Sequence, residues 1–138
     1  MTVHFPGNFG AADLGGKEKQ LGFAFSLAAR SIYLNLKKNP LERYQVTLEA
    51  THHGPFLSKA CCFVELGGTE KEWDDTEAAG FVADSILRGT EDYEFIETAI
   101  GIGGNHYCAT FNEFEGKYAL GHIIPKYAQE HVNKEILD

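Results

Sequence analysis

The sequence predicts an α/β fold: a three-layer sandwich with a mainly parallel or mixed sheet and helices on both faces. Segments with strand-like alternation or continuous apolar character alternate along the chain with segments of helical periodicity. Glycine or proline closes most of these segments. Strands that alternate with helices are typical of a mainly parallel sheet. The 138 residues are 43% hydrophobic and 23% charged, a globular composition, so we expect residues 1–138 to form one α/β domain.

The expected elements follow from local patterns. Strands are expected at residues 21–25, 44–50, 59–66, 93–102 and 117–124. Helices are expected at residues 26–38, 69–88, 109–114 and 127–137. The second helix opens with a capping box formed by Thr69 and Glu72, and Gly89 is expected to end it. The residues before Leu21 are rich in glycine and lack a regular period, so we expect a loop there, with a turn at Pro6-Gly7.

Two of the strands carry expectations about their surroundings. In residues 44–50, Leu48 and Ala50 are expected to face the core, while Glu49 lies on the polar face. Residues 59–66 are nearly all apolar, which predicts an interior strand covered on both faces. Because few helices are available to cover it, we expect an exposed sheet edge or apolar surface that a homodimer or a second chain buries.

The charge of the chain is acidic, with 20 acidic and 12 basic residues and a formal net charge of −8. Contacts to phosphate groups depend on Lys and Arg side chains. The composition therefore counts against a broad nucleic-acid surface. Any contact with nucleic acid must use a local basic patch or basic residues that this chain lacks.

The cysteines and the apolar runs indicate the cellular compartment of the protein. Cys61, Cys62 and Cys108 are odd in number and form no disulfide framework, which favours a reducing compartment. The N-terminal residues have neither the basic start nor the apolar core of a signal peptide. No apolar run reaches the roughly 20 residues that a membrane span requires. We expect a cytoplasmic protein without a membrane partner.

Histidines follow or end three of the expected strands. They lie in THHGP at residues 51–55, in GGNHY at residues 103–107 and in the Gly121-His122 pair. His4 precedes the glycine-rich opening loop. In open α/β sheets, ligands bind at the carboxyl ends of the strands. The three motifs are therefore expected to converge on one pocket.

Each histidine also has a structural alternative. His52 and His53 fit ordinary loop positions beside a Gly-Pro turn, His106 fits a cap of the turn after Gly104, and His122 fits a hydrogen-bonded core histidine. His131, in the polar terminal helix, is expected at the surface. The standard zinc spacings, such as paired CxxC or HExxH, do not occur.

The remaining polar motifs favour a water nucleophile. Serine and cysteine do not stand in a GxSxG setting, so water activated by histidine or by a histidine-bound metal fits better. The GIGG segment at residues 101–104 lacks the spacing of a dinucleotide fingerprint. It predicts a tight turn whose N–H groups can hold a carboxylate, a phosphate or an oxyanion. Glu49 is either a carboxylate that orients an imidazole or a solvated strand residue.

Five motifs in the same order resemble the D-aminoacyl-tRNA deacylases of the archaeal and plant type. They are HFPGNFG at residues 4–10, DLGG at 13–16, EATHHGP at 49–55, GIGGNHY at 101–107 and GHIIPKYA at 121–128. The resemblance implies a fold related to the phosphorylase and peptidyl-tRNA hydrolase folds. It also implies hydrolysis of the ester between a D-amino acid and the terminal ribose of tRNA, with zinc as cofactor. Family members are about twice as long, so residues 1–138 correspond to their central and larger part.

The resemblance implies roles for His4, Glu49, His52, His53, Asn105, His106 and His122. Water activation is assigned to His53 beside Glu49, or to zinc held by His52, His106 and His122. The Gly103-Gly104 turn, together with Asn105, would supply the oxyanion donors. The expected substrate-binding residues are His4, Asn8, Gly103, Gly104 and Tyr107.

Two other functions stay open on the sequence. One is another tRNA-linked hydrolase, for example one that acts on peptidyl-tRNA. The other is a non-catalytic fragment that binds a metal or a nucleotide and needs a partner chain. The first differs from the deacylase in its substrate, and the second predicts an exposed apolar patch.

Overall fold

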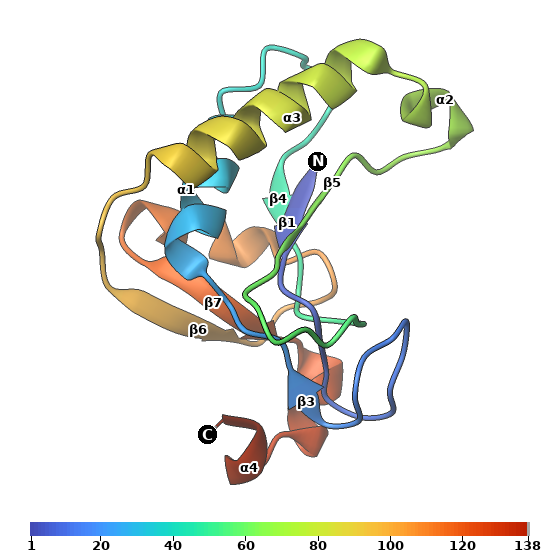
Figure 1. The fold of residues 1–138 in the computed structure, drawn as a ribbon, viewed down its shortest axis with the longest axis vertical. Coiled ribbons are helices and arrows are strands. Elements are labelled where there is room, and N and C mark those ends of the chain that lie inside the picture. The colour runs from blue at the N-terminus through green and yellow to red at the C-terminus, as the bar shows by residue number, and fades with distance from the viewer. Residues whose placement is uncertain (138) are drawn as a thin grey trace.

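The computed structural model describes residues 1–137, with the side chains of residues 135 and 137 outside the description. The strands form three small sheets (Figure 1). The first contains β4 (Thr47–Leu48), β1 (Thr2–His4) and β5 (Phe63–Glu65), in that order; the second pairs β6 (Thr98–Ile102) with β7 (Ala119–Ile124); the third pairs β2 (Gly7–Asn8) with β3 (Gln20–Leu21). The α-helices are α1 (Ser26–Leu36), α2 (Glu70–Trp73), α3 (Thr76–Glu91) and α4 (Lys134–Leu137), and the 3-10 helices are η1 (Ala109–Phe111), η2 (Phe114–Gly116) and η3 (Lys126–His131).

Parallel and antiparallel pairing are both present, so the expected α/β class with a mixed sheet is confirmed. β1 runs parallel to β4 and antiparallel to β5, and β6 runs parallel to β7. The residues after β4 connect these strands to the rest of the fold. The Ala50 N–H donates to the His106 carbonyl at 2.8 Å, and the Thr51 N–H donates to the Ile123 carbonyl of β7 at 2.9 Å. The segment after β4 therefore lies beside two of the histidine motifs.

The N-terminal residues form a central strand and not the expected loop. β1 lies between β4 and β5, and its residues Thr2, Val3 and His4 are all buried. A strand of three residues offers too few positions for a period of two to be recognised in the sequence. The expectation of a loop through the whole opening segment is wrong. The segment also contains β2 and the start of β3.

The core lies between β1 and the paired helices α1 and α3, which cross at one end of the molecule (Figure 1). The predicted stripe on α1 is confirmed, because Ala28, Ile32 and Leu36 are all buried. On α3 the buried stripe includes Val82 and Gly89. A methyl group on Gly89 would lie 2.5 Å from the Ile32 backbone nitrogen, so the glycine lets the two helices approach closely.

The predicted second helix is divided in two. The capping box of Thr69 and Glu72 starts α2 as expected, but α2 ends at Trp73 and Asp75 caps α3 separately. Gly89 lies inside α3 and does not end it. Trp73, expected on the buried face, is 63% exposed. The two adjacent aspartates, which favour caps over helix interiors, account for the division.

β5 is an edge strand and not the interior strand that its apolar sequence predicts. Among the strands of residues 1–137 it pairs only with β1, and Phe63, Val64 and Glu65 are half-buried. β6 likewise pairs on one side, with Ile100 and Ile102 more than half exposed. The expected exposed edge is therefore present in the described residues. Its burial by a homodimer or a second chain stays a prediction, which size-exclusion chromatography tests. Along the described chain, every helix is too short or too polar to cross a bilayer.

Candidate active site

One face of the three-stranded sheet carries the polar residues of the site. The register pairs Thr2 with Glu65 and His4 with Phe63. Because side chains alternate along a strand, these four residues share a face. Val3 of β1 faces the opposite way, into the core. The sequence around β1 and β5 thus separates an apolar face that packs on helices from a face that holds histidine and glutamate.

The carboxylate of Glu49 lies at the centre of this face. Its Oε2 atom is 3.3 Å from His106 Nε2, 3.6 Å from His4 Nδ1 and 3.7 Å from His52 Nε2. The Glu49 N–H donates to the Val3 carbonyl at 3.1 Å, which fixes the carboxylate beside β1. Only 5% of Glu49 is exposed, so the alternative of a solvated strand residue is wrong.

Four imidazole rings form a cluster with His52 at its centre, and three of them, those of His4, His52 and His106, contact this carboxylate. The His52 ring centroid is 4.2 Å from that of His4 and 4.4 Å from those of both His53 and His106. Phe63 of β5 stacks on the other side of His4, with centroids 5.1 Å apart. The THHGP and GGNHY motifs therefore converge, as their placement after strands predicts, and His4 joins them from β1.

Backbone carbonyls orient two of the rings. Nδ1 of His52 is hydrogen-bonded to the Ala50 carbonyl at 2.8 Å, and Nδ1 of His53 to the Gly54 carbonyl. A carbonyl can only accept, so Nδ1 of each ring carries the proton and Nε2 keeps a free lone pair. Such a nitrogen can accept a proton or bind a metal ion. His53 contacts His4 and His52 and not the Glu49 carboxylate beside which the sequence placed it.

Burial keeps the innermost rings neutral. Burial, together with the neighbouring rings of His52, His53 and His106, lowers the pKa of His4 to about 3. Burial also lowers the pKa of His52, although its hydrogen bond to Ala50 opposes this. Both rings are therefore uncharged at neutral pH, the form in which imidazole binds metals and accepts protons.

The donor atoms fit a zinc ion. Within the described residues, three groups each place their donor atoms within 4.8 Å of one another: His4 with His52 and His53, Glu49 with His52 and His106, and His4 with Glu49 and Glu65. Neutral imidazole and carboxylate are ligands that zinc accepts. In addition, both ring nitrogens of His4 are buried without a hydrogen-bond partner among the described residues. An unpaired buried polar group costs about 1–3 kcal/mol, which a bound ligand would offset.

His122 does not join the cluster. Its Nε2 donates to the Gly22 carbonyl at 2.8 Å, and its Nδ1 accepts from the Thr51 hydroxyl at 3.0 Å. Both ring nitrogens are therefore occupied, and the ring packs edge-on against Phe5. His122 therefore matches the alternative that its sequence context left open, a hydrogen-bonded core histidine and not a metal ligand. We leave His122 out of the proposed zinc site.

The glycine turn before His106 has the expected conformation but fewer free donors than expected. Gly103 and Gly104 adopt φ angles of 120° and 77°. The Gly103 N–H donates to the Ile124 carbonyl at 2.8 Å, so it is not available to an oxyanion. Asn105 is exposed beside His106. Tyr107 is 64% exposed, and its ring lies 5.2 Å from that of His106.

Asn8 lies outside the three-stranded sheet, in the small sheet of β2 and β3. Its side chain is buried against Gly16, where a methyl group would lie 1.8 Å from Asn8 Oδ1. Its Oδ1 has no hydrogen-bond partner among the described residues. The structure thus places Asn8 against the DLGG loop, and its contact with substrate stays a prediction.

Phe63 and Glu65 belong to the site although the sequence pattern did not indicate them. Both lie in the apolar run that predicts an interior strand, and both face the histidines because β5 alternates. The lone acidic residue in that run was the available signal. Glu65 and Glu49 line a groove of about 550 Å³ together with Thr2 and Tyr107.

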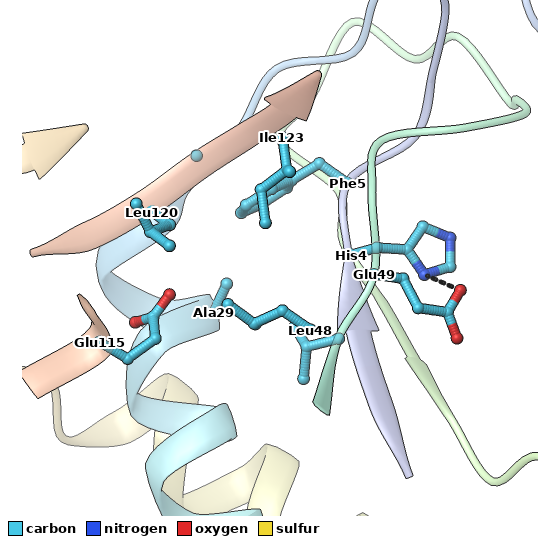
Figure 2. Close-up of a pocket in the computed structure, with 10 residues that line it drawn as sticks. His4, Phe5, Ala29, Leu48, Glu49, Glu115, Leu120 and Ile123 are labelled. Atoms are coloured by element: carbon cyan, nitrogen blue, oxygen red, sulfur yellow. Dashed lines mark ion pairs between the residues drawn. The ribbon is translucent and has the colours of Figure 1, made fainter. Parts of the chain in front are cut away.

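A small enclosed cavity lies behind the site. Figure 2 shows Glu115 projecting into it from one side among Leu120, Ala29 and Leu48, with the His4–Glu49 pair on the other side. Glu115 is 2% exposed, and its Oε2 has no partner among the described residues. Burial raises the pKa of Glu115 to about 7. The carboxyl is therefore held in the core mainly in its protonated form below neutral pH.

This burial predicts a pH dependence of stability. Folding raises the pKa of this carboxyl, so its ionisation costs more free energy in the folded protein than in the unfolded one. The free energy of unfolding is therefore expected to fall as pH rises from about 4.5 to about 7. The variant Glu115→Gln, which cannot ionise, should gain on the order of 2 kcal/mol over the unsubstituted chain between pH 5 and pH 8. Urea unfolding of both proteins at the two pH values measures this difference. An unchanged difference would mean that Glu115 is not buried as a neutral acid.

Comparison with known proteins assigns the chain to a family. The sequence model of the D-aminoacyl-tRNA deacylases matches residues 1–138. The chain belongs to that family. A D-aminoacyl-tRNA deacylase of Ignicoccus hospitalis is 39% identical over 139 residues, which cover 99% of this chain and 57% of that protein. One of Methanosarcina mazei is 41% identical over 144 residues, which cover 99% of this chain and 48% of that protein.

A solved structure shares the fold. It is described as a conserved protein of unknown function, and it matches with a TM-score of 0.90 and 38% identity over 99% of this chain and 50% of its own. The α/β fold is thus confirmed independently of the strand assignments. The chain spans about half the length of the curated relatives it matches.

Proposed function

We propose that this chain carries the hydrolytic centre of a D-aminoacyl-tRNA deacylase, which cleaves the ester between a D-amino acid and tRNA. The observation that supports this most is the buried Glu49 carboxylate in contact with three imidazoles from separate segments. Family membership supplies the substrate class, because the curated relatives are named D-aminoacyl-tRNA deacylases. The partner is accordingly a D-aminoacyl-tRNA.

The residues can perform ester hydrolysis with water as nucleophile. His106 is the most exposed of the imidazoles around Glu49, at 43% of its side chain, and lies nearest to the carboxylate. We assign to it the removal of a proton from water, with Glu49 stabilising the imidazolium that forms. His53 Nε2 offers a second basic nitrogen in the same cluster. We assign to the exposed amide of Asn105 the role of donor to the developing oxyanion.

We propose zinc as the cofactor. His52 is common to two of the three donor groups. With His4 and His53 as the other ligands, Glu49 and His106 would remain free for proton transfer. With Glu49 and His106 as the other ligands, the base would be His53. When bound, zinc would polarise the ester carbonyl and favour deprotonation of water. The chain's own residues orient the donor atoms, since the carbonyls of Ala50 and Gly54 fix the rings of His52 and His53.

The experiment that tests the function is hydrolysis of D-tyrosyl-tRNA and L-tyrosyl-tRNA by this chain under single-turnover conditions. We expect release of D-tyrosine well above the spontaneous rate and little acceleration with the L-substrate. Equal rates with the two substrates, or no acceleration with zinc present, would contradict the proposal. Substitution of the exposed His131 by alanine should leave the rates unchanged, because it lies outside the cluster.

Metal removal should act on the same centre. Chelation followed by dialysis is expected to lower the rate with D-tyrosyl-tRNA about tenfold or more, and zinc should restore it. Zinc at 100 times its dissociation constant should also stabilise the fold by about 2.7 kcal/mol, because it binds the folded cluster. Single-turnover assays measure the first effect and thermal unfolding the second, while atomic absorption verifies the metal content. A fully active protein without metal would exclude the cofactor from the reaction.

A further inference from the structure

The groove beside the histidine cluster is acidic. Glu49, Glu65 and Glu72 line it. Arg43 and Met1 also line it. The Arg43 guanidinium is paired with Asp75 at 2.8 Å and with Glu77 at 2.9 Å, and the N-terminal ammonium of Met1 donates to the Gln45 carbonyl at 2.7 Å. A surface of this charge repels phosphate groups and attracts cations. The groove therefore suits a positively charged part of a substrate and not the tRNA backbone.

Glu65 is placed to hold such a cation next to the reacting ester. Its carboxylate oxygen lies within 4.8 Å of donor atoms of both His4 and Glu49. It shares a face of β5 with Phe63, whose ring covers His4. Glu65 is half-buried at the wall of the groove, so its carboxylate faces both the cluster and the space in front of it.

A second polar group at this position lacks a partner. Thr2 lies directly across from Glu65 in the strand register and lines the same groove. Thr2 is 7% exposed, and its hydroxyl has no hydrogen-bond partner among the described residues. A buried hydroxyl without a partner costs free energy that a ligand would recover. A hydroxyl oxygen and a neighbouring carboxylate can together accept hydrogen bonds from an ammonium group, which has three N–H donors.

We propose that Glu65, with the hydroxyl of Thr2, binds the free α-ammonium group of the aminoacyl ester. This inference rests on the proposed function and names the part of the substrate that the groove recognises. The α-nitrogen is two bonds from the ester carbonyl carbon, so an ammonium held by Glu65 brings that carbon to the Glu49 and histidine cluster. N-acylated substrates, which have an uncharged amide in this place, lose the ion pair and leave the carboxylate unpaired.

The test compares D-tyrosyl-tRNA with N-acetyl-D-tyrosyl-tRNA. The unsubstituted chain is expected to prefer the free amine by at least about tenfold in kcat/KM. The variant Glu65→Gln should lose about 10- to 100-fold in kcat/KM on the free amine and change little on the acetylated substrate, while its zinc content stays the same. Glu97→Gln removes an equally negative but exposed side chain outside the groove and serves as the matched control.

The outcomes separate this inference from the proposed function. An equal loss on both substrates, accompanied by a loss of zinc, would make Glu65 a metal ligand and overturn the inference. An unchanged preference in Glu65→Gln would overturn it as well. If the chain hydrolyses neither substrate, the proposed function fails, and calorimetric binding of an adenosine carrying D-tyrosine through a 3′-amide still decides the role of Glu65. Weaker binding of this amine by the variant supports the inference, and equal binding overturns it.

Discussion

Replacing Glu49 with glutamine is expected to lower single-turnover hydrolysis of D-tyrosyl-tRNA by about 10²- to 10⁴-fold. Glutamine keeps the size of the side chain but removes the charge that stabilises an imidazolium on His106, 3.3 Å away. It also replaces one carboxylate donor of the proposed zinc site. The fold should persist, because the backbone N–H of Glu49 still donates to Val3.

The matched control for this substitution is again Glu97→Gln, which makes the same chemical change at an exposed glutamate. Circular dichroism and thermal unfolding verify that both variants are folded. If Glu49→Gln retained near-normal turnover, the carboxylate would have no part in proton transfer, and the role of base would pass to His53, whose Nε2 does not depend on Glu49.

The largest expected effect on stability comes from the crossing of α1 and α3. A methyl group at Gly89 would lie 2.5 Å from both the backbone nitrogen and Cγ1 of Ile32. Because backbone atoms cannot move aside as a side chain can, the helices must separate. Gly89→Ala should therefore destabilise the protein by about 2–3 kcal/mol.

Gly80 in the same helix is the natural control. In the described part of the chain, no atom lies within 4 Å of the position that its added methyl group would take. Gly80→Ala should consequently stabilise the protein by about 0.5–1 kcal/mol, through helix propensity alone. Urea unfolding of the two variants measures opposite shifts of the midpoint. Shifts of the same sign would mean that α1 and α3 do not pack as closely as the structure shows.

The sequence predicts those parts of the fold in which a pattern extends over several turns or strand positions. The helix α1 has Ala28, Ile32 and Leu36 at a regular spacing, and all three are buried. β1 could not be predicted, because three residues carry no recognisable period. The apolar run at residues 59–66, which contains β5, gave a wrong prediction for another reason. A continuous apolar segment indicates burial on both faces, yet here one face of β5 packs on the core and the other covers the histidines.

In the candidate site, too, the sequence predicts some features and not others. Convergence of the THHGP and GGNHY motifs follows from their positions after strands, and the structure brings His52, His53 and His106 together. His122 has the same kind of sequence context, but its two hydrogen bonds depend on Gly22 and Thr51, which are distant in the sequence. The sequence contains no signal for such partners. Only the three-dimensional structure distinguishes a histidine that faces a cluster from one that supports a core.

The central claim is that one cluster of imidazoles around Glu49 performs the hydrolysis, and His52 is the ring that contacts all the others. The most direct test is the single-turnover rate of D-tyrosine release by His52→Ala, with His131→Ala as the control and zinc in excess. We predict a loss of at least about 10²-fold for His52→Ala and no change for His131→Ala. Equal rates for the two variants and the unsubstituted chain would show that the reaction takes place elsewhere.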